Sequence, residues 1–487
     1  MIQTCYGGVK YLDGAGPCLP NVDRLDRGAW PMIHYMAQTG LQVDLSHFAK
    51  MEKELERDKE EITEQVHQIT GYYCNLDSAD QVSELLFKKL GLKQPKVKMT
   101  KSGDRESVEY EVLVQVQHQH EAVAPIMAFK EVSKLYGTYV RPMPKLARRS
   151  KFGEWRMYPK FGTTRIPSGR LNCKEPNLLA MPNRTKRGRE VCKGFITRPG
   201  WVYLSVDLSQ IEPRVIAHRS GDQALTKVYF NGEDLYSDYA INAFSLPDSR
   251  FKCNTPELCR IEATKDKYHF NGWHYPGVKK KEQRFPSKTC VLAWFYRVTA
   301  QGLVEQMPVI CKHCAVEATE HRKISPGCSF QALWQEDNCQ QLINAAAFKY
   351  TGVVRMWRQD EATARINRMA WDGWGRILHA GGTYSCHEYL VNQTLRELGN
   401  FPVQSTAQGP VKLSMAESFD ELEACGALGE VVNPLLQVHD ELLFEARESD
   451  AQEIGQYVIE VMENSVRLRV PLKAEMGTAV TWGDLVK

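Results

Sequence analysis

The sequence lacks the features that identify membrane, secreted or low-complexity proteins. No apolar run approaches the roughly twenty residues of a membrane-spanning helix, and the first residues contain no basic segment followed by an apolar core. The 14 cysteines are scattered along 487 residues without the dense spacing of a disulfide framework. Internal repeats are also absent. We therefore expect a globular protein of the cytoplasm, without a membrane anchor and with mostly reduced cysteines.

The chain also lacks an excess of charge of one sign. Its 62 Lys and Arg residues nearly balance 59 Asp and Glu residues, which gives a net charge of +3. Affinity for phosphate groups depends on where the cations lie rather than on their total. Two local basic runs, KQPKVKMTKSGDRES from Lys93 and KLARRSK from Lys145, are candidates for contact with nucleic acid. Each run taken alone is more often a solvated face.

Periodicity divides the chain into helical and strand-rich parts. From about Arg27 to Leu90, apolar residues recur at three- and four-residue spacing between charges, which predicts a long, solvent-facing helix pair. Short strands and turns follow from Trp155. The segment WVYLSVDL predicts a strand that ends near Asp207, and PLLQVHDELLFEA predicts a strand pair with Asp440 at its turn. The long stretch between these strands is mostly helical.

Two carboxylates at the ends of neighbouring strands can hold two divalent cations. Such a pair of ions clamps both oxygens of an in-line phosphoryl displacement. Magnesium suits this task because it takes oxygen ligands and leaves positions open for substrate phosphates. Asp207 and Asp440 are therefore candidate metal ligands, although an Asp after a strand is far more often a turn former.

A cationic helix adds specificity to this interpretation. In RFPSKTCVLAWFYRVTAQGL, four residues recur every four positions and share one helical face: Arg284, Lys288, Leu292 and Tyr296. The cations could bind a triphosphate, and the aromatic ring could stack on a base. By spacing alone, an ordinary amphipathic helix is about as good an interpretation.

Five motifs together resemble the family A DNA polymerases, the bacterial DNA polymerase I type. The first-aspartate motif is VDLSQIEPRVIAHRSGD, the second is QVHDELLFEA, and the nucleotide-binding helix is the segment quoted above. SGRLNCKEPNLLAMPNR and NFPVQSTAQGPVKLSM also match, and the resemblance extends from about Arg27 to Lys487. It implies an α/β (α+β) fold shaped like a right hand, with an antiparallel-sheet palm, helical fingers and a helical thumb.

The resemblance also implies a division of the chain. The expected parts are a short N-terminal extension at 1–28, a thumb with its connecting helices at 29–150, the first part of the palm at 151–225, fingers at 226–395 and the second part of the palm at 396–487. The fingers would contain the nucleotide-binding helix at 284–302 and two insertions, at about 248–281 and 308–335. We interpret the first insertion as a surface element that contacts DNA.

By the same resemblance, the chain would extend a primer with dNTPs by two-metal-ion nucleotidyl transfer. Asp207, Asp440 and the Leu208 carbonyl would hold two Mg²⁺ ions, for which Mn²⁺ could substitute, and Lys288 would protonate the pyrophosphate leaving group. The expected nucleotide-binding residues are Gln210, Glu212, Tyr236, Arg284, Lys288, Leu292 and Tyr296. The expected primer- and template-binding residues are Arg170, Asn177, Arg184, Arg396, Asn400, Gln404 and His439.

Glu212 and Tyr296 would select deoxynucleotides by blocking a ribose 2′-hydroxyl. Two residues depart from the family pattern. Leu292 stands where the family usually has Phe or Tyr, and an aliphatic side chain cannot stack as a ring does. Tyr236 stands where many relatives carry a phosphate-contacting histidine, and tyrosine has no positive charge at neutral pH. Pro286 within the cationic helix requires that the helix begin near it.

The origin and partners expected from the resemblance are those of a phage replication enzyme. Leucine variants such as Leu292 occur in viral members, which favours a phage origin and a location in the host cytoplasm. No paired-carboxylate exonuclease motif precedes the matching region, so we expect no proofreading. The expected partners are primer-template DNA and dNTPs, with a separate exonuclease, helicase or processivity factor as candidates, and we expect a monomer.

A cysteine cluster in the second insertion suggests a structural zinc ion. Cys311 and Cys314 form a CKHC pair with zinc-ligand spacing, and Cys328 and Cys339 are candidates for the second pair. The second pair lacks regular spacing, so plain core cysteines are the stronger alternative.

Two other functions stay open at this point. A single-subunit RNA polymerase would share the two aspartates and the cationic helix, but Glu212 and the SGRL and PVQ motifs argue against it. A catalytically inactive DNA-binding scaffold would have no need of metal ligands opposite a triphosphate site.

Overall fold

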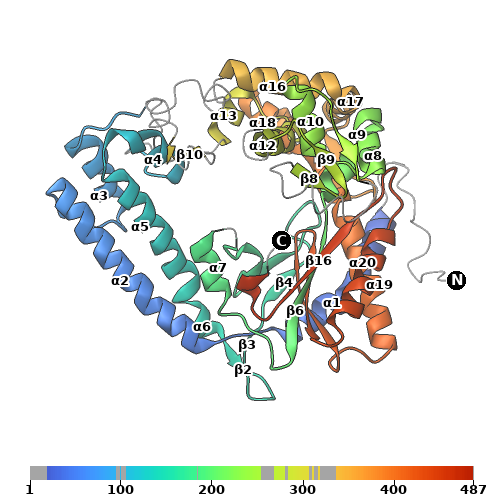
Figure 1. Ribbon diagram of the computed structural model, residues 1–487, viewed down its shortest axis with the longest axis horizontal. Helices are drawn as coiled ribbons and strands as arrows, with labels where there is room; N and C mark the ends of the chain where they lie inside the picture. Colours follow the sequence, from blue (N-terminus) through green and yellow to red (C-terminus); the bar gives the residue numbers. More distant parts are fainter. Residues whose placement is uncertain are drawn as a thin grey trace.

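A computed structural model describes residues 19–94, 99, 106–183, 185–253, 268–279, 283–306, 310–311, 316–317 and 336–485. Three groups of elements follow one another around the molecule (Figure 1). Long helices form an arm at one side, a four-stranded sheet with covering helices lies below, and a helical group lies above. These groups correspond to the expected thumb, palm and fingers.

The palm is built on an antiparallel sheet with strand order β14-β15-β6-β16. Its strands are β6 (Trp201–Leu208), β14 (Val432–Val438), β15 (Glu441–Arg447) and β16 (Ala474–Ala479). Alternate residues of β6 enter two different apolar clusters. Val202, Leu204 and Val206 belong to the main core, whereas Tyr203 belongs to the cluster that includes Phe48 of the thumb. Both faces of β6 are therefore buried.

Three helices cover the main-core face of this sheet. They are α1 (Leu19–Thr39), α19 (Gln408–Ala424) and α20 (Ala451–Asn464). Met32, Ile33 and Met36 of α1 are buried in the main core, and α1 packs on α19 and β14. The expected boundary between residues 28 and 29 is therefore wrong, because it divides a continuous helix whose apolar face belongs to the palm.

The thumb contains the long helix α2 (Leu45–Thr70), which packs on α5 (Val123–Leu135). Asp44 caps the start of α2 by accepting hydrogen bonds from the backbone N–H groups of Ser46 and His47, and Gly71 ends the helix at φ 72°. The expected pairing within Arg27–Leu90 is thus wrong, because the partner helix comes later in the chain. Shorter elements complete the thumb and the base that joins it to the palm: β1 (Leu41–Gln42), α3 (Ala79–Ser83), η1 (Glu84–Lys89), α4 (Tyr110–Val116), η2 (Gln117–Gln119), η3 (Tyr136–Val140), α6 (Met143–Leu146), β2 (Arg148–Arg149), β3 (Trp155–Met157), β4 (Lys160–Gly162), β5 (Asn172–Lys174), η4 (Leu178–Ala180), α7 (Lys186–Cys192) and η7 (Trp482–Asp484).

The fingers are mainly helical. Their helices are α8 (Ile211–Ser220), α9 (Gln223–Asn231), α10 (Leu235–Ala243), α12 (Phe285–Phe295), α13 (Ala300–Gln306), α16 (Glu336–Lys349), α17 (Thr351–Asn367) and α18 (Glu388–Thr406). Small strands and a turn join them: β7 (Phe251–Lys252), β8 (Tyr268–Phe270), β9 (Trp273–Tyr275), β10 (Ile310–Cys311), β11 (Val316–Glu317), β12 (Met369–Trp371), β13 (Ile377–His379) and η6 (Gly381–Tyr384). The expected boundaries at 225/226 and 395/396 divide α9 and α18, so they do not separate units of structure. None of the described helices is long and apolar enough to cross a membrane.

Candidate active site

Carboxylates gather at one end of the palm sheet. Asp207 lies at the end of β6, and the hairpin turn between β14 and β15 contains His439 and Asp440. His439 has φ 59°, a left-handed conformation that closes the tight turn. The Leu208 N–H donates to the Asp440 carbonyl over 3.1 Å. The fold thus joins the two expected metal ligands, 233 positions apart by residue number (440 − 207), at one edge.

Two further acids face Asp207 from the neighbouring strands. Glu441 on β15 and Glu475 on β16 are its direct register partners. Directly opposed residues of antiparallel strands project to the same face, where like charges repel. Glu441 is buried and accepts a hydrogen bond from Ser205. Neither acid was among the expected site residues, because only strand register places them beside Asp207.

This donor set fits magnesium bound together with substrate. Opposed carboxylates need a compensating cation, and all the donors are hard oxygens. Among the described residues, no three His, Cys, Asp or Glu side chains converge as a complete metal site. Magnesium rarely uses an all-protein cage, since it is commonly held by one or two carboxylates plus substrate phosphates. The end of the sheet that carries Asp207, Asp440, Glu441 and Glu475, called the acidic edge below, therefore fits an ion that arrives with a phosphate ligand.

Glu212 links this edge to the fingers. It is the second residue of α8, which begins directly after Gln210, and Gln210 has φ 55°. The Tyr296 hydroxyl donates to one carboxylate oxygen of Glu212, and Arg170 donates to the other over 2.5 Å. Burial raises the pKa of Glu212, and Arg170 partly offsets this effect. The structure thus joins Glu212 and Tyr296 as expected, and it also places Arg170 in this cluster.

The helix expected to bind the nucleotide, α12, begins at Phe285, directly after Arg284, and Pro286 fits in its first turn. The expected end at residue 302 is wrong, because α12 ends at Phe295. Arg297 adopts φ 59°, and its guanidinium donates to the Trp357 carbonyl of α17 over 3.2 Å. This left-handed residue turns the chain away from the helix axis, and Tyr296 lies at the turn.

The two faces of α12 differ in burial. Cys290, Val291 and Trp294 are buried in the main core. Lys288 is exposed and Leu292 is partly buried on the other face. The predicted surface of cations followed by an apolar side chain and a ring is therefore accessible.

The ring of Tyr236 lies beneath both cations of this helix. The Arg284 guanidinium is 5.2 Å from the ring centroid and the Lys288 ammonium is 5.7 Å from it, within the range of cation–π attraction. Burial raises the pKa of Tyr236 to about 12. The Tyr236 ring thus lies where it can stabilise both Arg284 and Lys288.

The other expected site residues are divided among several places. Gln210 accepts a hydrogen bond from the Tyr229 hydroxyl over 3.1 Å. Arg396, Asn400 and Gln404 lie at four-residue intervals on α18, exposed or half-buried. Asn177 at the start of η4 and His439 are exposed. Arg184 lies outside the described residues.

The expected zinc ligands are not described as a group. Cys314 and Cys328 lie outside the described residues, and only the backbone of Cys311 is described, in β10. Cys339 is buried in the main core on α16. The zinc ion stays a prediction.

Comparisons with known proteins agree with this geometry. Residues 45–257 and 274–484 match the model of DNA polymerase family A. The chain is 29% identical over 452 residues to "DNA polymerase I, thermostable" of Thermus filiformis, covering 93% of this chain and 47% of that protein. It is 26% identical over 462 residues to DNA polymerase I of Deinococcus radiodurans, covering 95% of this chain and 42% of that protein. The chain thus spans about half the length of these curated relatives.

A solved structure shares the arrangement. It is the POL domain of Pol1 from M. smegmatis in complex with DNA primer-template and dNTP. The TM-score is 0.75 at 25% sequence identity, and the match covers 94% of this chain and 70% of that chain. The right-hand α+β fold is therefore confirmed.

Proposed function

The chain belongs to DNA polymerase family A, and we propose that it extends a primer 3′ end with dNTPs under the direction of a template strand. The observation that carries this proposal is the contact between Tyr296 and Glu212. It joins the cationic helix α12 to Glu212 in the first turn of α8, and Glu212 lies five positions after Asp207 by residue number (212 − 207). Cations for a triphosphate and carboxylates for metal ions therefore belong to one site.

Asp207, Asp440 and the Leu208 carbonyl would hold the two Mg²⁺ ions. When bound, these ions would lower the pKa of the primer 3′-hydroxyl and neutralise charge that develops on the leaving group. Arg284 and Lys288 bind the triphosphate, and Lys288 delivers a proton to the departing pyrophosphate. Such cations contribute because phosphoryl transfer depends mainly on positioning and electrostatic stabilisation.

Glu212 and Tyr296 form the sugar gate in this proposal. Their hydrogen bond closes the space beside the sugar, so that a ribose 2′-hydroxyl would collide with a half-buried carboxylate that Tyr296 and Arg170 hold in place. This gate favours DNA synthesis over the RNA polymerase alternative. On α18, Arg396, Asn400 and Gln404 bind primer and template in a manner that does not depend on sequence.

The proposals on origin, location, partners and oligomeric state rest on fewer residues. A phage origin and a host-cytoplasmic location rest on Leu292 alone. A separate exonuclease, helicase or processivity factor is a candidate partner, and the expected monomer rests on the family resemblance.

A ternary-complex experiment tests template direction separately from turnover. The protein is mixed with Mg²⁺ and a template annealed to a primer that ends in a dideoxynucleotide, and each of the four dNTPs is added in turn. We expect a salt-resistant complex only with the dNTP complementary to the templating base. Equal stabilisation by all four dNTPs, or by none, would support the scaffold alternative instead.

A further inference from the structure

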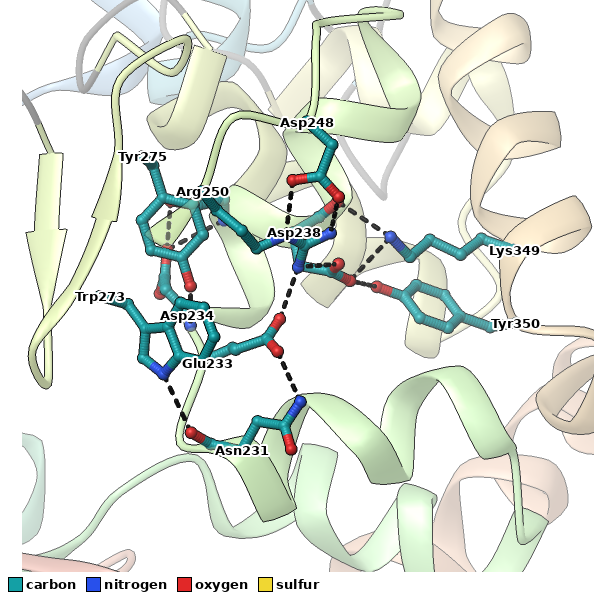
Figure 2. Close-up of polar contacts among 11 residues, drawn as sticks. Asn231, Glu233, Asp234, Asp238, Asp248, Arg250, Trp273, Tyr275, Lys349 and Tyr350 are labelled. Atoms are coloured by element: carbon teal, nitrogen blue, oxygen red, sulfur yellow. Dashed lines mark hydrogen bonds and ion pairs between the residues drawn. The ribbon is translucent and has the colours of Figure 1, made fainter. Parts of the chain in front are cut away.

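A small sheet in the fingers meets the turn that precedes α10. Its strand β9 pairs with β7 and β8, and the family match leaves out residues 258–273. Figure 2 shows side chains of this sheet against Asn231, Glu233 and Asp234. We expected this insertion to be a surface element, but Tyr275 is 1% exposed. The end of the insertion around His274 and Tyr275 is thus packed into the fingers, whereas β7 is exposed.

Two side chains of β9 hold the turn before α10. The Trp273 indole N–H donates to the Asn231 carbonyl over 3.0 Å. The Tyr275 hydroxyl accepts from the Asp234 backbone N–H over 2.7 Å. Both contacts reach backbone atoms rather than flexible side-chain ends, so they hold the backbone of the turn in place (Figure 2).

Arg250 holds the same turn from another side. Its guanidinium contacts Glu233 at 2.5 Å, Asp238 at 2.8 Å and Asp248 at 2.7 Å. Lys349 of α16 contacts Asp238 at 2.7 Å. Glu233 and Asp238 are almost fully buried, and buried carboxylates are costly unless they are paired in this way.

The residue fixed by these contacts is Asp234, which has two roles. One carboxylate oxygen accepts from the Ser237 N–H over 2.9 Å and so caps α10. The carboxylate also forms a two-pronged ion pair with Arg284, at 2.8 Å to Nε and 2.9 Å to Nη2. A paired fork of this kind sets the plane of a guanidinium as well as its position.

We propose that Tyr275 and Asp234 are positioning residues for the incoming nucleoside triphosphate. Tyr275 fixes the Asp234 backbone, and Asp234 aims the guanidinium of Arg284, the residue directly before α12, at the triphosphate. The role rests on the proposed function, since Arg284 is a triphosphate ligand only if the chain binds dNTPs. The packed insertion is thus part of the nucleotide-binding apparatus.

Single-nucleotide extension kinetics with Tyr275→Phe and Asp234→Asn test this role. Asparagine also caps helices, so Asp234→Asn removes the charge and keeps the cap. We expect KM for the dNTP to rise about three- to tenfold in Tyr275→Phe and about tenfold or more in Asp234→Asn, with kcat within about twofold. Affinity for primer-template, measured by fluorescence anisotropy, should not change.

Tyr139→Phe is the matched control. The buried Tyr139 hydroxyl also makes a backbone hydrogen bond, to the Ala180 carbonyl over 2.7 Å, but at the base of the thumb. We expect this variant to match Tyr275→Phe in lost thermal stability while retaining the wild-type KM. A rise in KM of the same size in both variants would show a general effect of destabilisation and overturn the role.

A double variant tests whether Asp234 acts through Arg284. If it does, Asp234→Asn should raise KM no further in an Arg284→Ala background. Multiplicative effects would overturn the role. Two failures remain distinguishable: a wild-type protein that extends no primer overturns the proposed function itself, whereas normal extension with an unchanged KM in Tyr275→Phe overturns only the positioning role.

Discussion

At the scale of single residues, we propose that Glu212 determines which sugar the site accepts. It is held between Tyr296 and Arg170, so its carboxylate cannot move aside for a ribose. We expect Glu212→Ala to lower the preference for dNTPs over rNTPs, measured as the ratio of kcat/KM values, by at least about tenfold. Glu453→Ala, an exposed change on α20, is the control. An unchanged ratio in Glu212→Ala would remove Glu212 from the gate.

Leu292 offers a second test at this scale. Its side chain is partly buried against the main core, between Lys288 and Tyr296 on α12. We expect Leu292→Phe to lower KM for dNTPs about two- to tenfold, because a ring adds stacking contact of about 0.5–1.5 kcal/mol. Pre-steady-state incorporation measures this change. Unchanged incorporation would mean that the nucleotide does not contact position 292.

Sequence motifs identified the site residues that lie within them. They did not identify residues that join the site only through strand register or through a contact with a distant part of the chain. Asp207, Glu212 and Tyr296 each lie in a quoted motif, and the structure places them around one site. Glu475 escaped notice because only its register with Asp207 shows that it belongs to the acidic edge. The Asp234 pair with Arg284 joins two helices and leaves no local pattern.

At the scale of elements, the cap of α2 stabilises the thumb. Burial raises the pKa of Asp44, but hydrogen bonds from Ser46 and His47 outweigh this effect, and the net pKa lies below the ordinary value. The native state therefore binds a proton less readily than the unfolded chain. The stabilisation is present above the ordinary Asp pKa and is lost as pH falls through the lowered pKa.

We expect Asp44→Ala to lower the free energy of unfolding of the thumb by about 1 kcal/mol at neutral pH. The difference from wild type should shrink in acid, once Asp44 is protonated. Hydrogen exchange of the α2 amides measures this local stability. Glu60→Ala, an exposed change within the same helix, should have little effect. A difference that persists unchanged at low pH would contradict the cap.

Elements were predictable where local chemistry defines them. Pro286 and the motif around it correctly indicated the start of α12, whereas its end depends on Arg297, whose left-handed turn is fixed by a contact with α17. The partner of α2 was missed because α5 lies beyond a long connection. Periodicity identifies a buried face but does not say which element covers it.

At the scale of the whole molecule, a buried ion pair joins the thumb base to the palm. Arg156 of β3 contacts Glu445 of β15 at 3.0 Å, and their side chains are 7% and 1% exposed. Arg198 and Asn433 also donate to Glu445. Both the strands and the cations come from distant parts of the sequence, so this junction depends on the complete fold.

We expect Glu445→Ala to lower the free energy of unfolding by about 3–5 kcal/mol, because the buried Arg156 loses its buried counter-charge and keeps only Glu154, whose side chain is 20% exposed. Asp23→Ala, which breaks the exposed pair with Arg27, should cost about 0–1 kcal/mol. Urea unfolding of both variants gives the comparison. Equal losses would mean that the buried pair does not hold the two regions together.

We propose that this fold copies a template by means of the acidic edge of the palm. Extension of a labelled primer-template with Mg²⁺ tests it most directly, comparing dNTPs with rNTPs and wild type with Asp440→Ala. We predict template-dependent extension with dNTPs, and a rate lower by at least about a hundredfold in Asp440→Ala, since a bound metal ion supplies several kcal/mol of transition-state stabilisation. Tight primer-template binding without extension by the wild-type protein, or full activity in Asp440→Ala, would contradict the account.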